Sequence, residues 1–264
     1  MKQRLKALSV LAGPPLGLLM LVIVSWDLAT RLFQIKKFLL PSPLDVCQAA
    51  VARGSDLCQA TILTGAEAMC GFGLSLVLGT LLACVFSQSR IIRSSVYPYA
   101  IFLQTVPIVA IAPLIVIWFG TGFHSVVLVS FIISLFPVLT NATAGLIQID
   151  SDLIDLFRLN RATRLQILIK LRLPHAVPHI IVGARTASGV AVIGSIVGEF
   201  FAGYGTQHHG LGYYIMYTAQ QLKTDLLFAS VFASTLLGIV IFSATNLTGA
   251  AILRQWYHQP AAEW

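Results

Sequence analysis

The sequence predicts an all-α polytopic membrane protein with about six transmembrane helices, and three observations support this fold class. The mean hydropathy is +0.84 and only 10% of the 264 residues are charged, against about a quarter in soluble domains. Several apolar stretches reach the roughly 20 residues that a helix needs to cross a hydrocarbon core of about 30 Å. The basic residues gather in short segments between these stretches, as they do in the cytoplasmic loops of membrane proteins.

Six membrane spans follow from the apolar stretches. Three basic residues precede the first span, but no small-residue cleavage site follows it, so we expect an uncleaved helix and not a signal peptide. Ser42 and Pro43, between the first two spans, suit a helix cap and a first helical residue, and they predict a short helix at the outer interface. The predicted spans cover residues 9–30, 58–86, 94–119, 123–146, 176–201 and 226–250.

The distribution of basic residues predicts that both chain ends are cytoplasmic. With the N-terminus inside, the cytoplasmic segments hold eleven Lys and Arg residues and the outer segments hold five, while Arg185 lies within a span. Short loops rich in Lys and Arg stay on the cytoplasmic side. We therefore expect a multi-pass chain surrounded by membrane lipid, with both termini inside.

Small residues recur at every fourth position in the second and fifth predicted spans. This spacing lets two helix backbones approach closely, which favours helix association in lipid. We expect a tightly packed core, and ordinary bundle packing is the alternative explanation for most of these positions. The residues are Gly71, Ser75, Gly79 and Ala83 in the second span, and Gly183, Ala187, Ala191 and Ser195 in the fifth, with Glu199 at the next step.

Pathway candidates come from the third span and from charged residues inside spans. Pro98, Pro107 and Pro113 lie in the third span, and each removes a backbone donor and bends a helix. Such defects are tolerated only beside protein or water, so a break near Gln104 and Pro107 would line a pathway; a merely kinked packing helix is the alternative. Glu199 is a further candidate because a charge within a span is costly, with an internally paired or interface-anchored charge as the alternative.

The sequence lacks the motifs of catalytic and nucleotide-binding sites. It has no Gly-x-x-x-x-Gly-Lys-Ser/Thr motif, and the glycines of "GYGTQHHGLGYYI" do not follow a strand as a dinucleotide fingerprint would. The four cysteines show no Cys-x-x-Cys spacing, so we expect no metal and no cofactor. The net charge of +7 lies on no aromatic-rich soluble surface, so nucleic-acid binding is not expected. The chain is predicted not to be an enzyme.

The stretch "RLNRATRLQILIKLRLPHAVP", residues 158–178, holds five of the seventeen basic residues. Ser151 or Asp152 is expected to cap a helix with Asp155 in its first turn, and two prolines would stop it. An amphipathic cytoplasmic helix of this kind suits a partner protein, and a segment resting on anionic lipid is the alternative. The expected basic stripe is Arg158, Arg161 and Arg164, the apolar patch is Leu165, Leu168 and Ile169, and the prolines are Pro174 and Pro178.

This segment resembles the cytoplasmic loop of ABC-importer permeases, which contains Glu-Ala-Ala, a glycine and a terminal Leu-Pro. Setting Leu173 and Pro174 on the Leu-Pro places Asp155-Leu156-Phe157 on Glu-Ala-Ala and Arg161 on the glycine. "LPSPLDV", "TVPIVAIAPLIVIWFGTG", "VIGSIVGEF" and "GLGYYI" are similar to the nitrate, sulfonate, taurine and pyrimidine-precursor branch of this binding-protein-dependent transport family. The resemblance covers about residues 38–250.

The resemblance implies the permease subunit of an ABC importer in the cell inner membrane, moving a small nutrient with ATP hydrolysed by a separate subunit. It implies one permease domain, residues 1–264, with a core of about 58–250 after an N-terminal spanning helix and outer interfacial helix in 1–57. The implied partners are a cytoplasmic ABC ATPase, an extracytoplasmic solute-binding protein and a second permease chain, identical or paired. Glu67 and "LFRLNRAT" lean toward pyrimidine or flavin precursors.

In that family the loop docks on the ATPase as a coupling helix. Two departures make this loop bulkier: Leu156 and Phe157 replace paired alanines, and Arg161 replaces the glycine that lets the loop turn. A secondary transporter is the alternative function, which would need an inverted repeat or a midplane ion site. The coupling residues implied by the resemblance are Asp155, Leu156, Phe157, Arg158, Arg161, Ala162, Arg164, Leu165, Leu168 and Pro174.

Overall fold

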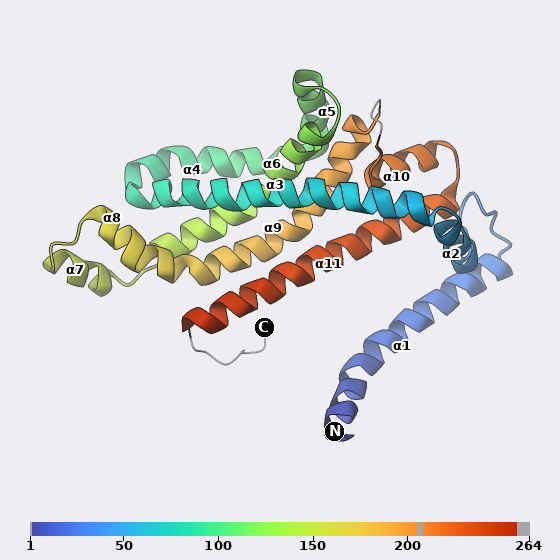
Figure 1. Ribbon diagram of the computed structural model, residues 1–264, viewed down its shortest axis with the longest axis horizontal. Coiled ribbons are helices and arrows are strands. Elements are labelled where there is room, and N and C mark those ends of the chain that lie inside the picture. The colour runs from blue at the N-terminus through green and yellow to red at the C-terminus, as the bar shows by residue number, and fades with distance from the viewer. Residues whose placement is uncertain (1, 205–207, 258–264) are drawn as a thin grey trace. The chain divides into compact units, whose positions relative to one another are not determined.

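The computed structural model describes residues 2–204 and 208–257, and every regular element in these ranges is helical (Figure 1). The prediction of an all-α protein is confirmed. The elements are α1 (Lys2–Leu32), α2 (Pro43–Ala52), α3 (Gly54–Gln88), α4 (Arg90–Thr105), α5 (Ile108–Phe119), α6 (Phe123–Ile147), α7 (Ser151–Leu159), α8 (Arg164–Ile167), the π-helical η1 (Leu168–Arg172), α9 (Leu173–Ala202), α10 (Leu211–Gln220) and α11 (Thr224–Tyr257).

The helices group into two compact units. The N-terminal unit contains the chain up to Cys58 together with Tyr214–Phe232, and the core unit contains Gln59–Tyr213 together with the chain from Ala233 onward. The division passes through α3, α10 and α11. All the residues that the sequence predicted as coupling, pathway or packing residues lie in the core unit.

The N-terminal unit contains the short helix predicted after the first span. Ser42 is the N-cap of α2 and Pro43 its first residue, as predicted, and Ser42 forms a reciprocal capping box with Asp45. Lys37 makes an ion pair with Asp45 at 2.5 Å. The hydrogen bonds from Lys37 and from Ser42 lower the pKa of Asp45, so the capping carboxylate stays charged at neutral pH.

Aromatic packing joins α1 to the first turns of α11 within the N-terminal unit. The Trp26 ring lies 5.6 Å from the Phe228 ring and 6.2 Å from the Phe232 ring, between centroids. Thr224 also donates a hydrogen bond to the Lys37 carbonyl at 2.6 Å. These contacts tie segments that are nearly two hundred residues apart in sequence into one unit.

In the core unit, small residues of α3 and α9 both face α6. A Cβ atom added to Gly71 would lie 2.6 Å from the Ser130 Cβ, and one added to Gly194 would lie 2.7 Å from the Ser130 Cα. The Ser130 hydroxyl donates to the Ala191 carbonyl at 2.9 Å. α6 is therefore held at backbone-to-backbone distance on two sides, which only residues without bulky side chains allow.

The other members of the two small-residue repeats continue these contacts. A Cβ on Gly79 would lie 2.9 Å from Val138 Cγ1, and one on Gly183 would lie 2.9 Å from the Pro137 carbonyl oxygen. Ser75, Ala83, Ala187, Ala191 and Ser195 are fully buried.

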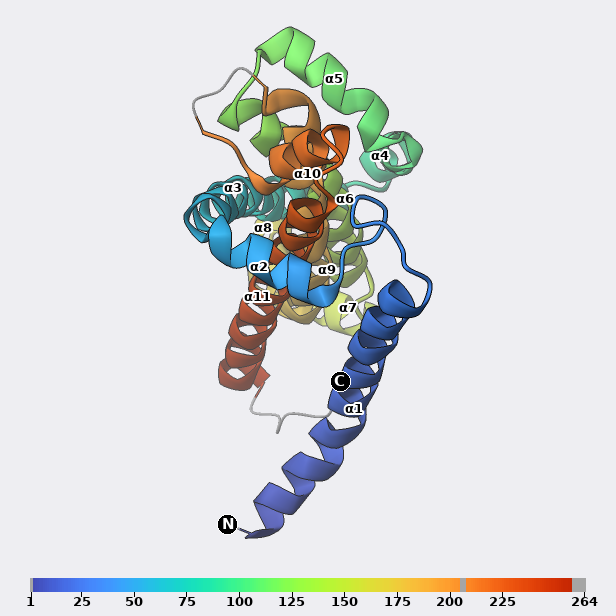
Figure 2. The same ribbon diagram turned by 90° about the vertical axis from the view of Figure 1, so that its right-hand side faces the viewer.

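The predicted spans correspond to helices with one exception. Four helical runs of the described chain are long and apolar enough to cross a membrane: α3, α6, Arg164–Ala202 and α11. α1 covers the predicted first span. The predicted third span, 94–119, consists of two helices, because α4 ends at Thr105 and α5 begins at Ile108; this is the broken helix that the sequence offered as one of two alternatives. Figures 1 and 2 both show the chain changing direction between α4 and α5.

The sequence at this break explains it. Pro107 has no N–H to continue the helix, and its ring clashes with the carbonyl four residues earlier. Proline also disfavours the helical conformation for the residue before it, which here is Val106. Pro107 has φ of −61° and ψ of 120°, which is extended backbone.

Candidate functional site

α7 begins one residue earlier than predicted. Asp150, and not Ser151 or Asp152, is the N-cap residue, and its side chain accepts the backbone N–H of Asp152 at 3.0 Å. Asp155 consequently lies in the second turn, where it pairs with Arg158 at 3.1 Å. Both side chains of this pair are mostly exposed, so it adds little to stability.

The single long helix predicted here is interrupted after α7. Arg161 has φ of 53°, in the left-handed region that costs a residue with a Cβ about 1–2 kcal/mol. The Ala162 N–H donates to the Phe157 carbonyl at 3.0 Å and closes the turn. Arg158, Arg161 and Arg164 therefore do not form one helical stripe, and that prediction is wrong. The position that resembles the family's loop glycine does have a glycine-like conformation.

α8 starts at a second capping box and runs directly into α9. Thr163 Oγ1 accepts the Gln166 N–H at 3.3 Å, and Gln166 Oε1 accepts the Thr163 N–H at 2.8 Å. From there Arg164–Ala202 is one uninterrupted helical run. Pro174 and Pro178 lie inside this run, so the prediction that they stop the helix is wrong. The π-helical turn η1 lies just before Pro174. Its wider hydrogen-bond spacing lets the helix continue although Pro174 has no backbone N–H to donate.

Contacts to α3 and α6 anchor the beginning of α9. The Arg172 guanidinium donates to the Ser87 carbonyl near the end of α3. His175 Nδ1 lies 3.0 Å from the Gly145 carbonyl oxygen in the last turns of α6. A Cβ on Gly145 would lie 2.6 Å from the His179 Cβ. The run that starts at α8 is therefore attached firmly to two neighbouring helices.

The segment from α7 to α8 presents leucine and arginine side chains together, and we call these residues the loop surface. Leu156 is 53% exposed, Leu159 is 82% exposed and Leu165 is 62% exposed. Clustered exposed apolar side chains rimmed by charge are typical of interaction sites. The loop surface consists of Leu153, Leu156, Leu159 and Leu165 with Arg158, Arg161 and Arg164. Among the other predicted coupling residues, Asp155 is exposed, whereas Phe157, Ala162, Leu168 and Pro174 are half-buried.

The break between α4 and α5 leaves both predicted pathway residues exposed. Gln104 lies in the last turn of α4, and Pro107 caps α5 without a side-chain hydrogen bond. Phe102 and Val109, on either side of the break, are also more than half exposed. The helix is broken and not merely kinked, which decides between the two alternatives for its shape. A place beside the pathway stays a prediction.

Glu199, the third pathway candidate, lies in a buried polar cluster at the end of α9 and is only 2% exposed. Thr64 Oγ1 donates to Glu199 Oε1 at 2.6 Å, and the Gly212 N–H donates to Glu199 Oε2. Thr64 Oγ1 also accepts the Leu211 N–H at 2.9 Å. Two side chains, from α3 and α9, therefore cap the first turn of α10, whose N–H groups have no partners within their own helix.

Two glycines provide the space for this cluster. A Cβ on Gly210 would lie 2.0 Å from Glu199 Oε1, and one on Gly212 would lie 2.3 Å from the Ile196 carbonyl oxygen. A side chain at either position would displace the carboxyl group or the α9 backbone. The glycine alternation in "GLGYYI" therefore has a steric cause.

The sequence did not reveal Thr64, Gly210 and Gly212 as members of this cluster. The available signal was a glutamate at the end of an apolar span, followed closely by Gly-Leu-Gly at the start of a helix. The cluster fastens α3, α9 and α10 together, so Glu199 has a local structural task whatever its relation to a pathway. Within residues 2–204 and 208–257, no three metal-ligating side chains come together.

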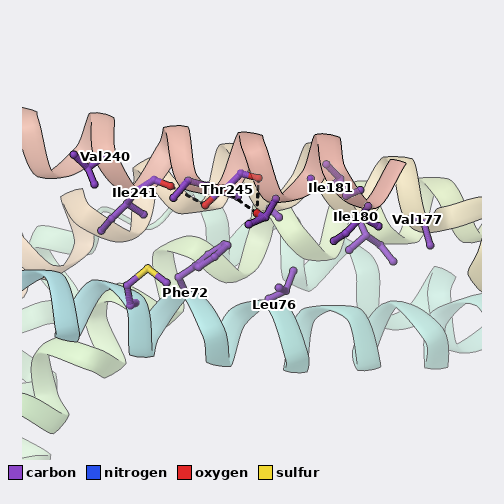
Figure 3. A pocket seen from close by; sticks show the side chains of 14 residues that line it. Phe72, Leu76, Val177, Ile180, Ile181, Val240, Ile241 and Thr245 are labelled. Carbon is purple, nitrogen blue, oxygen red and sulfur yellow. Dashed lines mark hydrogen bonds between the residues drawn. The ribbon is translucent and has the colours of Figure 1, made fainter. Parts of the chain in front are cut away.

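A groove of about 420 Å³ lies between α3, α9 and α11 in the core unit (Figure 3). Phe72 and Leu76 of α3 point toward Ile181 of α9 and toward Ile241 and Thr245 of α11. The Thr245 hydroxyl donates to the Ile241 carbonyl at 2.9 Å, so its proton is already used. The groove offers mainly apolar contacts and does not suit a polar nutrient.

Comparison with known proteins adds independent information about this chain. The family described as "Binding-protein-dependent transport system inner membrane component" matches residues 75–255. This range includes the last part of α3, from Ser75 to Gln88, the α4–α5 break, the loop surface and the Glu199 cluster apart from Thr64.

Two named relatives are similar over most of their length. The formylaminopyrimidine transport permease protein ThiX of Halalkalibacterium halodurans is 34% identical over 236 residues, covering 88% of this chain and 90% of that protein. The riboflavin transport system permease protein RibX of Chloroflexus aurantiacus is 32% identical over 257 residues, covering 95% and 94%.

A solved structure has a similar fold. A chain of the MetNI methionine ABC transporter in an inward-facing conformation matches with a TM-score of 0.65 and 17% sequence identity, covering 76% of this chain and 98% of that chain. At this level of identity the similarity concerns the fold.

Proposed function

The chain belongs to the family of binding-protein-dependent transport system inner membrane components, and we infer that it is the permease subunit of an ABC importer for a small nutrient. The observation that carries this inference is the family match over residues 75–255. Relatives named as transport permeases over nearly the whole chain support it, as do the multi-spanning all-α fold and the absence of a nucleotide-binding motif from the sequence.

The loop surface is the proposed docking site for a separate ATPase subunit. Its leucines supply apolar contact area, and its arginines favour an acidic partner surface. α8 continues without a break into α9, so a displacement of α8 would move α9 as a rigid body. Close-packed contacts are poorly compressible, and those between α9 and α6 would transmit the movement to the rest of the core unit.

A second permease chain, a homodimer in the simplest case, would complete the pathway in this proposal. The break between α4 and α5 is exposed, and Pro107 leaves a helical carbonyl without its usual donor. Backbone of this kind is costly in lipid and is tolerated beside protein or water. We therefore place Gln104 and Pro107 at the meeting of the two chains, with a solute-binding protein docking on the outer side and lipid around the remaining surface.

The proposed orientation has both termini in the cytoplasm. The excess of basic residues on the segments assigned inside supports it. In this orientation the loop surface faces the cytoplasm, where ATP and the ATPase are found, and the Glu199 cluster lies toward the outer side.

The proposed substrate is a nitrogen heterocycle of the pyrimidine or flavin-precursor type. The names of ThiX and RibX, formylaminopyrimidine and riboflavin permeases, support this class. The alternative within the same function is a small sulfonate, taurine or nitrate.

Reconstitution tests the function. Proteoliposomes that contain the permease, with its ATPase on the inner side of the vesicle membrane, should take up a labelled heterocycle under one condition. ATP must be present inside the vesicles and the solute-binding protein outside them. Labelled taurine in the same vesicles tests the substrate class separately. Uptake driven by an ion gradient without the ATPase would instead show a secondary transporter.

A further inference from the structure

Glu67 of α3 lies beside the Glu199 cluster and is only 3% exposed. Its carboxyl group is hydrogen-bonded to that of Glu199. Its Oε2 atom is buried and has no hydrogen-bond partner among the described residues. Two carboxyl groups from different helices thus meet inside the core unit, and one oxygen remains unpaired.

The hydrogen-bond directions identify which carboxyl group carries a proton. Glu199 accepts from the Thr64 hydroxyl and from the backbone N–H groups of Gly212 and Tyr213, an arrangement that suits a carboxylate. A carboxylate has no donor, so a hydrogen bond between two carboxyl groups requires one of them to be protonated. Glu67 is therefore the donor and Glu199 the acceptor.

Among the described residues, no Lys or Arg side chain lines the cavity beside Glu67, and His208 is the basic side chain there. The groups that act on it are Glu199 from α9 and Cys70 from its own helix. From α6, Phe123 and Val126 form part of the wall. The α6 residue His124 is directed toward the Phe119 carbonyl, at 2.8 Å.

A cavity of about 170 Å³ connects the pair to an exposed side chain. It is lined by Glu67 and Glu199 and also by His208, which is exposed. The neighbouring His209 is stacked on Tyr213, with ring centroids 3.9 Å apart. The cavity is large enough for water, so a proton on Glu67 has a route for exchange with solvent.

We propose that Glu67 is a positioning residue, held as a neutral carboxylic acid, whose O–H donates to the Glu199 carboxylate and thereby fixes the first turn of α10 against α3 and α9. The proton is a structural component and is not transported. The proposal goes beyond the transport function and does not depend on the substrate. Loss of the proton would place two like charges together in a buried site, and the pair would separate.

Matched amide variants test the assignment of donor and acceptor in the intact permease–ATPase complex. Glu67→Gln replaces the O–H donor with an N–H donor of the same shape, so we expect thermal stability and uptake close to those of the native protein. Glu199→Gln places an amide N–H among groups that already donate hydrogen bonds, so we expect a large fall in thermal stability and in uptake. Glu67→Ala, which removes the donor altogether, should also destabilise, and rescue by glutamine would separate donation from packing.

The pH dependence of stability is the readout that packing alone would not change. The folded pair holds one proton, whereas both carboxyl groups are ionised in the unfolded chain above about pH 5. As the pH rises above this value, the ratio of folded to unfolded protein should therefore fall about tenfold more per pH unit in the native protein than in Glu67→Gln. Asp56→Asn, which changes a half-buried acid paired with Arg53 at the start of the same helix, should leave the slope unchanged. The infrared carbonyl band of a protonated carboxylic acid should disappear in Glu67→Gln.

Three results would overturn the proposal. One is an infrared band that persists in Glu67→Gln, and another is a tolerated Glu199→Gln beside a destabilised Glu67→Gln. The third is a stabilisation of the native protein by Na⁺ or K⁺ that Glu67→Gln abolishes, because it would make Glu67 an ionised cation ligand. None of these depends on uptake, so they are distinguishable from a failure of the transport function.

Discussion

The two ends of the helical run from α8 to α9 differ in burial and in hydrogen bonding. At one end Glu199 is buried and joined by hydrogen bonds to Thr64 of α3 and Gly212 of α10. At the other end the helix extends through η1 into α8, where Arg164 and Leu165 are exposed. The helical run is therefore fastened inside its own chain at the Glu199 end, whereas its α8 end, beyond the contacts of Arg172 and His175, presents side chains that can contact another molecule.

This difference indicates how the helix works in the proposed importer. Buried polar groups that are fully paired specify one arrangement strongly, because any displacement leaves donors without acceptors. Exposed leucines and arginines have little to hold them until a partner covers them. The Glu199 end would fix the position of α9 relative to α3 and α10, and the α8 end would receive the movement of the ATPase.

The largest expected effect follows from filling the space at the fastened end. Gly210→Ala places a Cβ on the Glu199 carboxyl group. The added atom overpacks the site and breaks buried hydrogen bonds, so the unfolding free energy should fall by on the order of 2–5 kcal/mol. The thermal unfolding of the detergent-purified complex measures it. Gly189→Ala is the matched control, because no atom lies within 4 Å of its added Cβ, and it should be neutral or slightly stabilising. Equal unfolding temperatures for the two variants would show that the cluster is not rigid.

A smaller effect is expected from a charge reversal at the free end. Arg164→Glu should weaken ATPase binding roughly thirtyfold, on the order of 2 kcal/mol, because it presents a like charge to the proposed acidic surface. Co-purification and binding-protein-stimulated ATP hydrolysis measure this, with membrane insertion checked in parallel. Arg90→Glu, at the exposed start of α4, is the control and should retain binding. Normal binding with failed insertion in Arg164→Glu would make the arginine a topology signal only.

The smallest effect concerns the turn between α7 and α8. Arg161→Gly removes the Cβ penalty at a φ of 53°, so we expect a gain in stability of about 1 kcal/mol. Arg158→Gly, within α7, should instead lose about 1 kcal/mol. The two unfolding temperatures should therefore move in opposite directions. A loss in both would mean that the Arg161 side chain contributes contacts that outweigh its backbone strain.

Features that depend on nearby residues were predictable from the sequence. The break at Pro107 follows from one missing donor and one ring clash, both set within a few residues. The repeats that contain Gly71 and Gly183 indicated close helix approach, since four-residue spacing is a property of a single helix. The cap of α2 at Ser42 was predictable for the same reason.

Features that depend on distant residues were not predictable. The Thr64–Glu199 hydrogen bond joins residues 135 apart and the Leu211–Thr64 bond joins residues 147 apart, and no local pattern encodes either. The long helix predicted through Arg161 was wrong, because arginine gives no sign of a left-handed backbone. The expected stop at Pro174 was wrong as well, because the π-helical turn before it lets the helix continue.

The central claim is that α8 and α9 form one rigid connection between the ATPase and the core unit. Ile169 and Lys170 of η1 are exposed, so replacing both by glycine removes little packing but loosens the helix by about 1 kcal/mol per residue. The matched pair Ile169→Ala and Lys170→Ala keeps the helix. The measurement is substrate taken up per ATP hydrolysed in proteoliposomes. The account predicts a normal ratio for the alanine pair and a several-fold lower ratio for the glycine pair with ATPase binding intact, whereas a normal ratio in the glycine pair would contradict it.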